Sequence, residues 1–318
     1  MTTVAVIIPC YRDSSTLSRA LDSVMAQSRR PDEIIVVNDA SPETAEIEAV
    51  LTAYPIVRYV VNTQNLGLAA TRNAGVQVAS TEIVSFLDAD DELHPQKIEF
   101  QLSLYCPRRT VSCSVARIGD ERGIDGVVTY SGEPNYFVFT DSSMLVRKNI
   151  LTGASMLISR ELFLSLGGYD AKLRSCEDFD FWLRVLDTNI PVYNINLPLY
   201  LYRVNENGLS RNLLNISYWE LEVVKKYYDR QHLARARPSG EAITLVIWLF
   251  KHFVRYEYCR DQKLLEATCR NLQLLNRWPV ERLLLVIAQK IGLPRLVGFL
   301  LGSRRIRKQM PTQPMRLE

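Results

Sequence analysis

Four short apolar runs, separated by helical patterns, occupy the N-terminal part of this 318-residue chain. The runs are rich in β-branched residues and cover residues 4–9, 33–39, 57–62 and 82–90. The patterns between them place apolar residues at helical spacing and cover residues 14–27, 41–54 and 67–79. Continuous apolar runs suit strands that are covered on both faces. Repeated units of this kind predict an α/β fold, in which helices flank a mostly parallel central sheet.

Polar side chains stand where these strands are expected to end. The expected ends carry Pro9 to Tyr11, Asn38 with Asp39, Asn62, and Asp88 to Asp91. In open α/β sheets, ligands bind in the crevice outside the carboxyl ends of the strands. The sequence therefore predicts that this edge of the sheet is a binding site.

The fourth apolar run leads directly into a group of acids. Asp88, Asp90, Asp91 and Glu92 lie within five positions, and like charges this close repel one another. A turn that brings Asp88 and Asp90 together would offer Mg²⁺ or Mn²⁺ the hard oxygen ligands that these ions prefer. The alternative is a solvated turn, in which Asp90 or Asp91 caps the helix expected near Pro95.

Two further charged residues lie near the same edge, and each allows two interpretations. Asp39 would accept hydrogen bonds from a base or a ribose, or it would cap the following helix, a role that Ser41 can fill by itself. Arg72 lies in an Ala-rich helical pattern, where it would reach a phosphate or a base edge, or would pair with an acid at the surface.

The sequence CEDFDFWLR opens a predicted helix with acids, namely Glu177, Asp178 and Asp180. A carboxylate at this point would act as a general base that takes the proton of an incoming hydroxyl. Burial beside Phe179 and Trp182 would raise its pKa toward the working range. Acids in a first helical turn are also favourable through the helix macrodipole, so a purely structural role stays open.

A polar stretch, YRVNENGLS, follows a strand-like run at residues 192–205, where proline favours an edge position. Arg203 would pair with a diphosphate there, and Asn205 and Ser210 would donate hydrogen bonds to it. The alternative is an ordinary surface loop.

Composition changes twice along the rest of the chain. Residues 110–150 are rich in Gly, Ser and Thr, with strand-like pieces at 126–130 and 136–139, and they predict a β-rich or irregular insertion. Helical patterns dominate after about residue 210, so we expect one domain at 1–210 and a helical region at 211–318.

The C-terminal end combines apolar and basic residues. Leucines and other apolar residues at 282–301 lead into Arg304, Arg305, Arg307 and Lys308. A basic amphipathic end of this kind would lie on an anionic membrane surface. The alternative is a helix that packs on the N-terminal domain or on a second copy of the chain.

Bulk properties argue against several classes of protein. A net charge of +3 is small for this length, which argues against a dedicated nucleic-acid binder. Six scattered cysteines without a CxxC pair predict reduced thiols of a cytoplasmic protein, not disulfides or a zinc site. The N-terminus lacks a basic region and no run reaches about 18 apolar residues, so we expect neither a signal peptide nor a membrane span.

Six stretches of the sequence, taken together and in their order, resemble a known protein family, although none of them is sufficient by itself. They are VIIPCYRD, EIIVVNDAS, NLGLAATRNAG, FLDADDEL, GASMLISRELFLSLGGYD and CEDFDFWLR. Over about residues 4–210 the chain resembles the family 2 inverting glycosyltransferases, which have the GT-A fold. The resemblance implies a metal-assisted enzyme that moves a sugar from a nucleotide-sugar, usually a UDP-sugar, to a saccharide or lipid-linked saccharide acceptor. Such an enzyme would be cytoplasmic or peripheral at the inner face of the membrane, as a monomer or a homo-oligomer.

The resemblance also implies roles for individual residues. Those that would bind the nucleotide are Pro9, Tyr11, Asp39, Arg72 and Asp88. Asp39 would read the uracil, and Asp90 would hold Mn²⁺ or Mg²⁺ together with Asp88. Those that would border the donor sugar and the acceptor are Gly153, Ala154, Ser155 and Trp182. Asp178 would be the general base, with Glu177 as the second candidate.

One position departs from the family pattern. Many relatives carry His where this chain has Asn205, in the loop implied to bind the diphosphate with Arg203 and Ser210. Asn is a weaker metal ligand than His, so metal affinity or donor choice would differ in this chain.

Two other functions stay open. In the first alternative, the chain is a non-catalytic partner of another glycosyltransferase and only binds the nucleotide-sugar. The presence of Asp88, Asp90 and Asp178 argues against this alternative. A metal-dependent nucleotidyltransferase would bring a Gly-rich, basic phosphate loop near the first strand, and PCYRDSST does not supply one.

Overall fold

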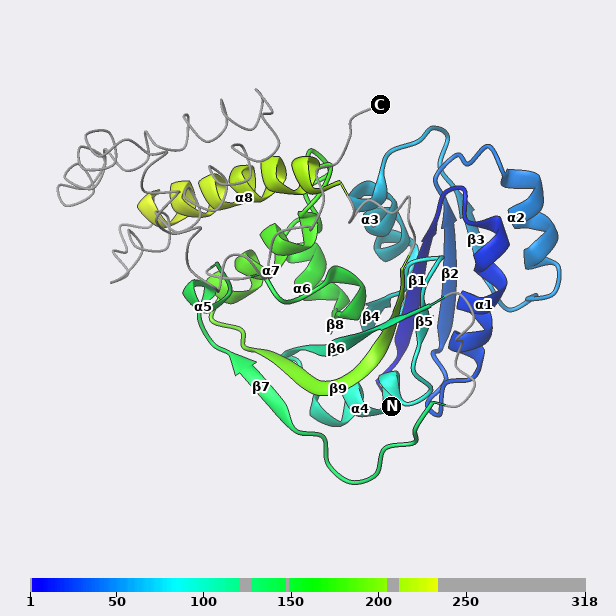
Figure 1. Cartoon of the computed structure of the whole chain (residues 1–318), viewed down its shortest axis with the longest axis horizontal. Helices are drawn as coiled ribbons and strands as arrows, with labels where there is room; N and C mark the ends of the chain where they lie inside the picture. Colours follow the sequence, from blue (N-terminus) through cyan, green and yellow to red (C-terminus); the bar gives the residue numbers. More distant parts are fainter. Residues whose placement is uncertain (1, 120–126, 147–148, 205–211, 234–318) are drawn as a thin grey trace, which may run out of the picture. The chain divides into compact units, whose positions relative to one another are not determined.

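The computed structural model describes residues 2–119, 127–146, 149–204 and 212–233 (Figure 1). The chain divides into two units, Met1–Gly208 and Leu209–Glu318, where the sequence predicts a boundary near residue 210. The described part of the second unit is one helix, α8 (Leu213–Leu233), which the helical pattern predicts. Asn205, Ser210 and the basic C-terminal end at 282–308 lie outside the described residues.

The first four strands form a parallel half-sheet. They are β1 (Val4–Cys10), β2 (Glu33–Asn38), β3 (Arg58–Val61) and β4 (Ile83–Phe86), in the spatial order β3-β2-β1-β4. β1 pairs in parallel with both β2 and β4, and all 7 of its residues are buried. Both faces of β1 must therefore be covered, which is what its continuous apolar run predicts.

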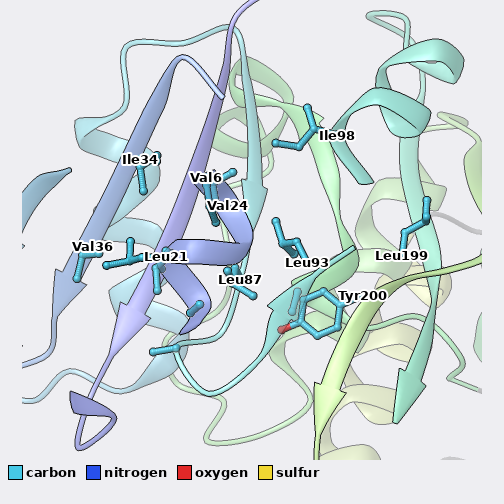
Figure 2. Packing of buried hydrophobic residues seen from close by; sticks show 14 of the residues in the cluster. Val6, Leu21, Val24, Ile34, Val36, Leu87, Leu93, Ile98, Leu199 and Tyr200 are labelled. Atoms are coloured by element: carbon cyan, nitrogen blue, oxygen red, sulfur yellow. The ribbon is translucent and has the colours of Figure 1, made fainter. Parts of the chain in front are cut away.

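Helices cover the two faces of this half-sheet. The connecting helices are α1 (Ser14–Met25), α2 (Thr44–Leu51) and α3 (Leu68–Val78). Val6 of β1 packs in one cluster with Leu21 and Val24 of α1 (Figure 2). Ile7 points to the other face, because side chains alternate along a strand. There a Cβ on Gly75 of α3 would come within 2.3 Å of Ile7, so glycine is what allows α3 to pack directly on β1.

The second half of the sheet mixes strand directions. It contains β8 (Leu157–Ser159), β6 (Thr110–Ile118), β9 (Val192–Arg203) and β5 (Glu92–Leu93), and β7 (Tyr136–Phe139) pairs with β9. β8 is antiparallel to β4 and β6, and β5 and β7 are antiparallel to β9. Only β6 and β9 run parallel here. Because β8 is antiparallel to both β4 and β6, strands β6 and β9 run in the same direction as β1 to β4. The prediction of a mostly parallel sheet is therefore confirmed, and β5, β7 and β8 are its antiparallel strands.

Strand β9 is not the edge strand that its proline suggests. It pairs with β6, β7 and β5. Pro198 lies opposite Ser114, between two register shifts in the ladder that joins β6 to β9. The irregular register accommodates a residue that cannot donate a ladder hydrogen bond, so the proline marks a bulge and not an edge.

The segment 110–150 is β-rich as predicted, with β6 inside the sheet and β7 beside β9. Residues 127–130, a predicted strand-like piece, form no strand. Instead the Gln96 side chain accepts from the Tyr130 N–H at 2.8 Å and donates to the Tyr130 carbonyl at 3.0 Å.

The remaining short elements surround the mixed half of the sheet. They are α4 (Lys97–Leu104), α5 (Ser142–Val146), the 3₁₀ turn η1 (Gly153–Ser155), α6 (Arg160–Ser165) and α7 (Glu177–Asp187). The predicted acidic helix that opens at Glu177 is present as α7. In the described ranges, no helix has both the length and the hydropathy needed to cross a bilayer.

Candidate functional site

The carboxyl ends of β1, β2 and β4 lie at one edge of the sheet, because these strands are parallel neighbours. Backbone strain gathers beside them. Among the described residues, Arg12 (φ 61°) follows β1, Ala40 (φ 51°) follows β2, and Cys176 (φ 61°) directly precedes α7, while a fourth such residue, Asn189 (φ 60°), lies after the far end of α7. Non-glycine residues in this left-handed region are uncommon and cluster at functional sites. The strained positions therefore support a site at the edge that the sequence predicts.

The carboxylate of Asp39 accepts hydrogen bonds from other groups of the protein. Its Oδ1 accepts hydrogen bonds from Asn62 Nδ2 at 2.8 Å and from the Leu66 N–H at 2.9 Å, and its Oδ2 accepts from the Gly67 N–H at 2.8 Å. These bonds fix the loop that leads into α3, so the helix-cap interpretation of Asp39 is wrong. A carboxylate oxygen accepts about two hydrogen bonds, so Oδ2 can still accept one from a ligand.

Arg72 joins three segments that are far apart in the sequence. Its Nη1 donates to Glu177 Oε1 at 2.9 Å, and its Nη2 donates to Asp88 Oδ1 at 2.5 Å. Arg72 is only 3% exposed, so the interpretation as a surface salt-bridge partner is wrong. Its Nε has no hydrogen-bond partner in the structure. Arg72 thus ties α3 to the loop after β4 and to the start of α7.

Asp178 lies at the opening of α7 with its carboxylate fixed by the backbone. Oδ2 accepts from the Gly153 N–H at 2.9 Å and Oδ1 accepts from the Phe179 N–H at 2.7 Å. Asp178 is half-buried, whereas its neighbour Glu177 is buried and paired with Arg72. Burial raises the pKa of both carboxyl groups, and the Asp178 charge raises that of Glu177 further. Asp178 is therefore the more open and the less neutralised of the two acids.

Tyr169 belongs to the same group of residues, although the sequence gives it no role. Its hydroxyl is buried and has no hydrogen-bond partner in the structure. The Asn73 side chain accepts from the Tyr169 N–H at 2.9 Å and donates to the Tyr169 carbonyl at 2.8 Å. A Cβ on Gly153 would lie 2.9 Å from the Tyr169 hydroxyl oxygen. The one available signal was Asn73 itself, a poor helix former inside an Ala-rich helix.

Negative charge concentrates after β4. Burial and the charge of Asp88 raise the pKa of Asp90 to about 6. Burial and the charge of Asp90 raise the pKa of Asp13 to about 6, although the sequence gives Asp13 no role. Nearby cations therefore do not fully balance these carboxylates.

The acids after β4 are also the residues that the sequence predicts as metal ligands. No group of three or more His, Cys, Asp or Glu side chains in the described ranges has the arrangement of a metal site. Mg²⁺ and Mn²⁺ are often held by one or two carboxylates, with phosphate oxygens and water as the other ligands. Asp90, whose charge is not fully compensated, and Asp88, which is paired with Arg72, fit binding of that kind. The described residues do not form a complete set of protein ligands around the ion.

Asp91 and Glu92 bind β9. The Tyr200 hydroxyl donates to Asp91 at 2.6 Å, and the Arg203 N–H donates to the same carboxylate at 2.7 Å. The Arg203 guanidinium pairs with Glu92 and donates to the Gly119 carbonyl at 3.0 Å. Arg203 is 4% exposed, so neither an open surface loop nor a free guanidinium is observed. The predicted diphosphate contact of Arg203 would therefore require this buried guanidinium to become accessible, and it stays a prediction.

The other predicted site residues differ in exposure. Tyr11 is 38% exposed at the end of β1, whereas Pro9 is buried in the strand. Ala154 and Ser155 are buried. Trp182 is 0% exposed, so our prediction that it borders the sugars is wrong. It lies on the buried face of α7 and packs in the core, which its spacing with other apolar residues already indicated.

Comparison with solved structures identifies the class. S. aureus TarS 1–349 in complex with UDP-GlcNAc superposes with a TM-score of 0.66 over 86% of this chain and 81% of that chain, at 17% identity. S. aureus TarS 1–349 in complex with UDP gives a TM-score of 0.58 over 79% and 72%, at 18% identity. The fold is that of the GT-A glycosyltransferases.

The sequence comparisons give the family. The family described as glycosyl transferase family 2 matches residues 5–167, and the chain belongs to it. An uncharacterized glycosyltransferase of Haemophilus influenzae is 29% identical over 229 residues, which are 71% of this chain and 76% of that protein. One of Rickettsia bellii is 28% identical over 190 residues, 57% of this chain. The aligned region spans only 27% of the length of the Rickettsia protein.

Proposed function

We propose that this chain transfers a sugar from a nucleotide-sugar, most simply a UDP-sugar, to an acceptor hydroxyl with inversion at the anomeric carbon. The observation that carries the proposal is the state of Asp178. Its carboxylate is half-buried, fixed by two backbone N–H groups, and adjacent to Glu177, whose charge Arg72 already compensates. A fixed carboxylate with a raised pKa has the properties of a general base.

The nucleotide would bind at the carboxyl edge of β1 and β2. Tyr11 is exposed enough to contact a base, and Asp39 Oδ2 has capacity for one more donor, such as the N–H of a uracil. The fold shared with TarS, which was solved in complex with UDP and with UDP-GlcNAc, supports a uridine nucleotide. Asp88 would meet the ribose or the metal, and the hydrogen bond from Arg72 would orient its carboxylate.

A divalent ion, Mn²⁺ or Mg²⁺, would be held by Asp90 and Asp88. The chemistry that these two residues would thereby bring to the site is Lewis-acid stabilisation of the negative charge on a departing diphosphate. The chain's own contribution is to hold these two carboxylates at the end of β4, close enough for the charge of Asp88 to act on Asp90. The raised pKa of Asp90 is the electrostatic consequence when no cation is present.

Asp178 would take the proton of the acceptor hydroxyl while the bond from that oxygen to the anomeric carbon forms and the bond to the diphosphate breaks. One in-line displacement of this kind inverts the anomeric centre. A retaining mechanism would need a nucleophilic carboxylate, and the ion pair of Glu177 with Arg72 argues against Glu177 in that role. The acceptor would be a saccharide or a lipid-linked saccharide.

The test is UDP release by the purified protein from UDP-glucose, UDP-galactose and their N-acetyl forms, with Mn²⁺ and with a chelator. Asp178→Asn should retain UDP binding by calorimetry and lose transfer by about 10²- to 10⁴-fold, the usual contribution of a general base. Glu177→Gln should keep a larger share of the rate per folded molecule. Transfer by Asp178→Asn at the normal rate would show that our base assignment is wrong.

Two outcomes would favour other functions. Tight UDP binding by the wild-type protein, without turnover of any donor, would indicate a non-catalytic partner of another glycosyltransferase. Failure of the full chain to float with anionic liposomes would remove the proposed membrane contact of the basic C-terminal end at 282–308.

A further inference from the structure

A lysine is fully buried beneath the candidate site. Lys97 of α4 is 0% exposed, and its Nζ donates to Ser85 Oγ of β4 at 2.7 Å and to Gln101 Oε1 of α4 at 2.9 Å. Within the described ranges, no carboxylate lies at ion-pair distance from it. Burial lowers the pKa of Lys97 to about 8. An amine without an anionic partner is unfavourable in a core, so its retention calls for a physical reason.

The partners of Lys97 converge on one turn, η1. Gln101 Nε2 donates to the Ser155 carbonyl at 2.8 Å, and Ser85 Oγ donates to the Met156 carbonyl at 2.9 Å. Ser112 of β6 adds a hydroxyl contact of 2.6 Å to Ser155 Oγ. The side chains that hold the turn are all 0% exposed: Ser85, Lys97, Gln101 and Ser112. Buried hydrogen bonds that are fully satisfied rigidify the segment they join.

Lys97 fixes the direction of these bonds. An ammonium group donates three hydrogen bonds and accepts none. Gln101 must therefore turn its carbonyl oxygen to Lys97, which leaves its NH₂ group to face the Ser155 carbonyl. Ser85 must accept from Lys97, which leaves its own O–H to donate to Met156. Without the cation, Gln101 Oε1 and the Ser85 hydroxyl oxygen would each lose a buried donor, while Gln101 Nε2 would still face the carbonyls of Ser155 and Val111.

The other end of the same turn carries the hydrogen bond to Asp178. The Gly153 N–H donates to Asp178 Oδ2 at 2.9 Å, and within the turn Ser155 Oγ donates to the Thr152 carbonyl at 2.9 Å. A short 3₁₀ turn therefore links the buried polar side chains to the acid that the proposed function makes the base. A displacement of its carbonyls would move the Gly153 N–H.

We propose that Lys97, Gln101, Ser85 and Ser112 form a positioning network that holds η1 against the sheet and thereby orients the Asp178 carboxylate. The catalytic part of this inference rests on the proposed role of Asp178. The structural part, that the network holds η1, does not depend on it. None of the four residues touches the substrate in this proposal, so their effect is on the rate of transfer and not on donor affinity.

The variant Gln101→Glu tests the network directly. The carboxylate keeps an acceptor for Lys97 but loses the donor to Ser155. The matched control is Gln27→Glu. Gln27 is also a buried amide: it accepts from the Ile98 N–H of α4 at 3.1 Å and donates to the His94 carbonyl at 2.7 Å, with no bond to η1. Each variant loses the two N–H bonds of its amide, to the Ser155 and Val111 carbonyls for Gln101 and to the Ser23 and His94 carbonyls for Gln27. The new carboxylate at position 101 faces the Lys97 ammonium, whereas the one at position 27 has no cationic partner in the described ranges, so the control should be destabilised at least as much as the test variant.

Two measurements are needed. Hydrogen exchange of the peptide spanning residues 151–158 should accelerate about 10-fold in Gln101→Glu and stay unchanged in Gln27→Glu. The kcat for transfer should fall about 10- to 100-fold in Gln101→Glu, with the Kd for UDP within about 2-fold of wild type. Gln27→Glu should keep kcat within about 2-fold. Exchange and kcat that match those of the control would overturn the proposal.

A second variant keeps the test decisive if Gln101→Glu does not fold. Ser112→Ala removes only the hydroxyl contact to Ser155, and it should change exchange and kcat in the same direction by a smaller factor. If Gln101→Glu does not fold, unchanged exchange at residues 151–158 in Ser112→Ala and in Lys97→Met overturns the proposal. If the wild-type protein turns over no donor, the proposed function fails, while the exchange measurement still decides whether the network holds η1.

Discussion

The backbone N–H of Gly153 donates to Asp178 Oδ2 at 2.9 Å, and the two residues approach so closely that no side chain fits between them. A Cβ built on Gly153 would lie 2.9 Å from Asp178 Cβ and 2.9 Å from the Tyr169 hydroxyl oxygen. Real Cβ atoms do not approach other atoms this closely, so glycine is required for the contact. The turn and the acid are therefore fitted to one another.

The first prediction follows from that contact. Gly153→Ala should displace Asp178 and lower kcat by about 10- to 100-fold, because small misplacements of a reacting group cost that much. The Kd for UDP should stay near that of the wild type. Gly119→Ala is the control, since nothing lies within 4 Å of a Cβ at Gly119. Equal kcat values for the two variants would contradict the fitted contact.

The second prediction concerns Arg72 and its two acidic partners, the buried Glu177 and the half-buried Asp88. Arg72→Met leaves Asp88 and Glu177 without their cation, and it should lower the free energy of unfolding by about 3–5 kcal/mol in urea denaturation. Adding Glu177→Gln should recover part of the loss, because one of the two unpaired charges is then gone.

The matched control for Arg72 is Arg160→Met. Arg160 is half-buried and donates to the carbonyls of Val76 and Gln77, so its loss leaves no charge unpaired. We expect a loss of about 1–2 kcal/mol for this variant. A double-mutant cycle in which the effects of the Arg72 and Glu177 substitutions simply add would show that the ion pair contributes nothing.

The third prediction concerns the acids after β4. The pKa of Asp90 in the folded protein, about 6, lies above its ordinary value of 3.8, so the folded state binds the proton more tightly than the unfolded state. Asp90 therefore lowers stability as pH rises from about 4 to about 6, and the loss is complete at pH 7. Asp90→Asn should raise the unfolding free energy at pH 7 by on the order of 1–2 kcal/mol, and it should abolish the effect of Mn²⁺ on UDP affinity.

Asp88→Asn should change the stability in the opposite direction, and it serves as the comparison for Asp90→Asn. Its loss breaks the ion pair with Arg72, so the Tm should fall at pH 7. Melting curves at pH 4.5 and pH 7, with and without UDP and Mn²⁺, distinguish the two variants. A lower Tm for Asp90→Asn at pH 7 without metal would contradict the electrostatic account of this cluster.

The fourth prediction uses the buried amine of Lys97. Its pKa of about 8 lies below the ordinary value of 10.5, so between pH 8 and 10.5 the unfolded chain binds more protons than the folded one. Stability due to this group therefore rises with pH across that window. Relative to Lys97→Met, the wild type should gain about 1 kcal/mol of unfolding free energy between pH 7 and pH 9 in urea. The difference between the two proteins should be flat between pH 5 and pH 7, and a flat difference up to pH 9 would contradict the prediction.

Local patterns were enough to locate most of the elements. The runs at 4–9, 33–39 and 82–90 correspond to β1, β2 and β4, because burial on both faces leaves a continuous apolar signature in the sequence. The acids at 88–92 and 177–178 were found at strand and helix ends for the same reason, since a charge that interrupts an apolar pattern is visible without a structure. Strand direction is not local, so the antiparallel direction of β8 could not be predicted, and the two-residue strand β5 was missed.

The sequence by itself determined which segments are buried, where they stop and which acids stand at their ends, since each of these depends on neighbours in the chain. Only the tertiary structure decided which partners those groups meet. Arg72 pairs with Glu177, which is 105 residues away in the sequence, and Arg203 pairs with Glu92, which is 111 residues away. Lys97 became the centre of a polar network because α4, β4 and β6 meet around it. A side chain carries its charge in the sequence, but its partners depend on distances that only the packed chain sets.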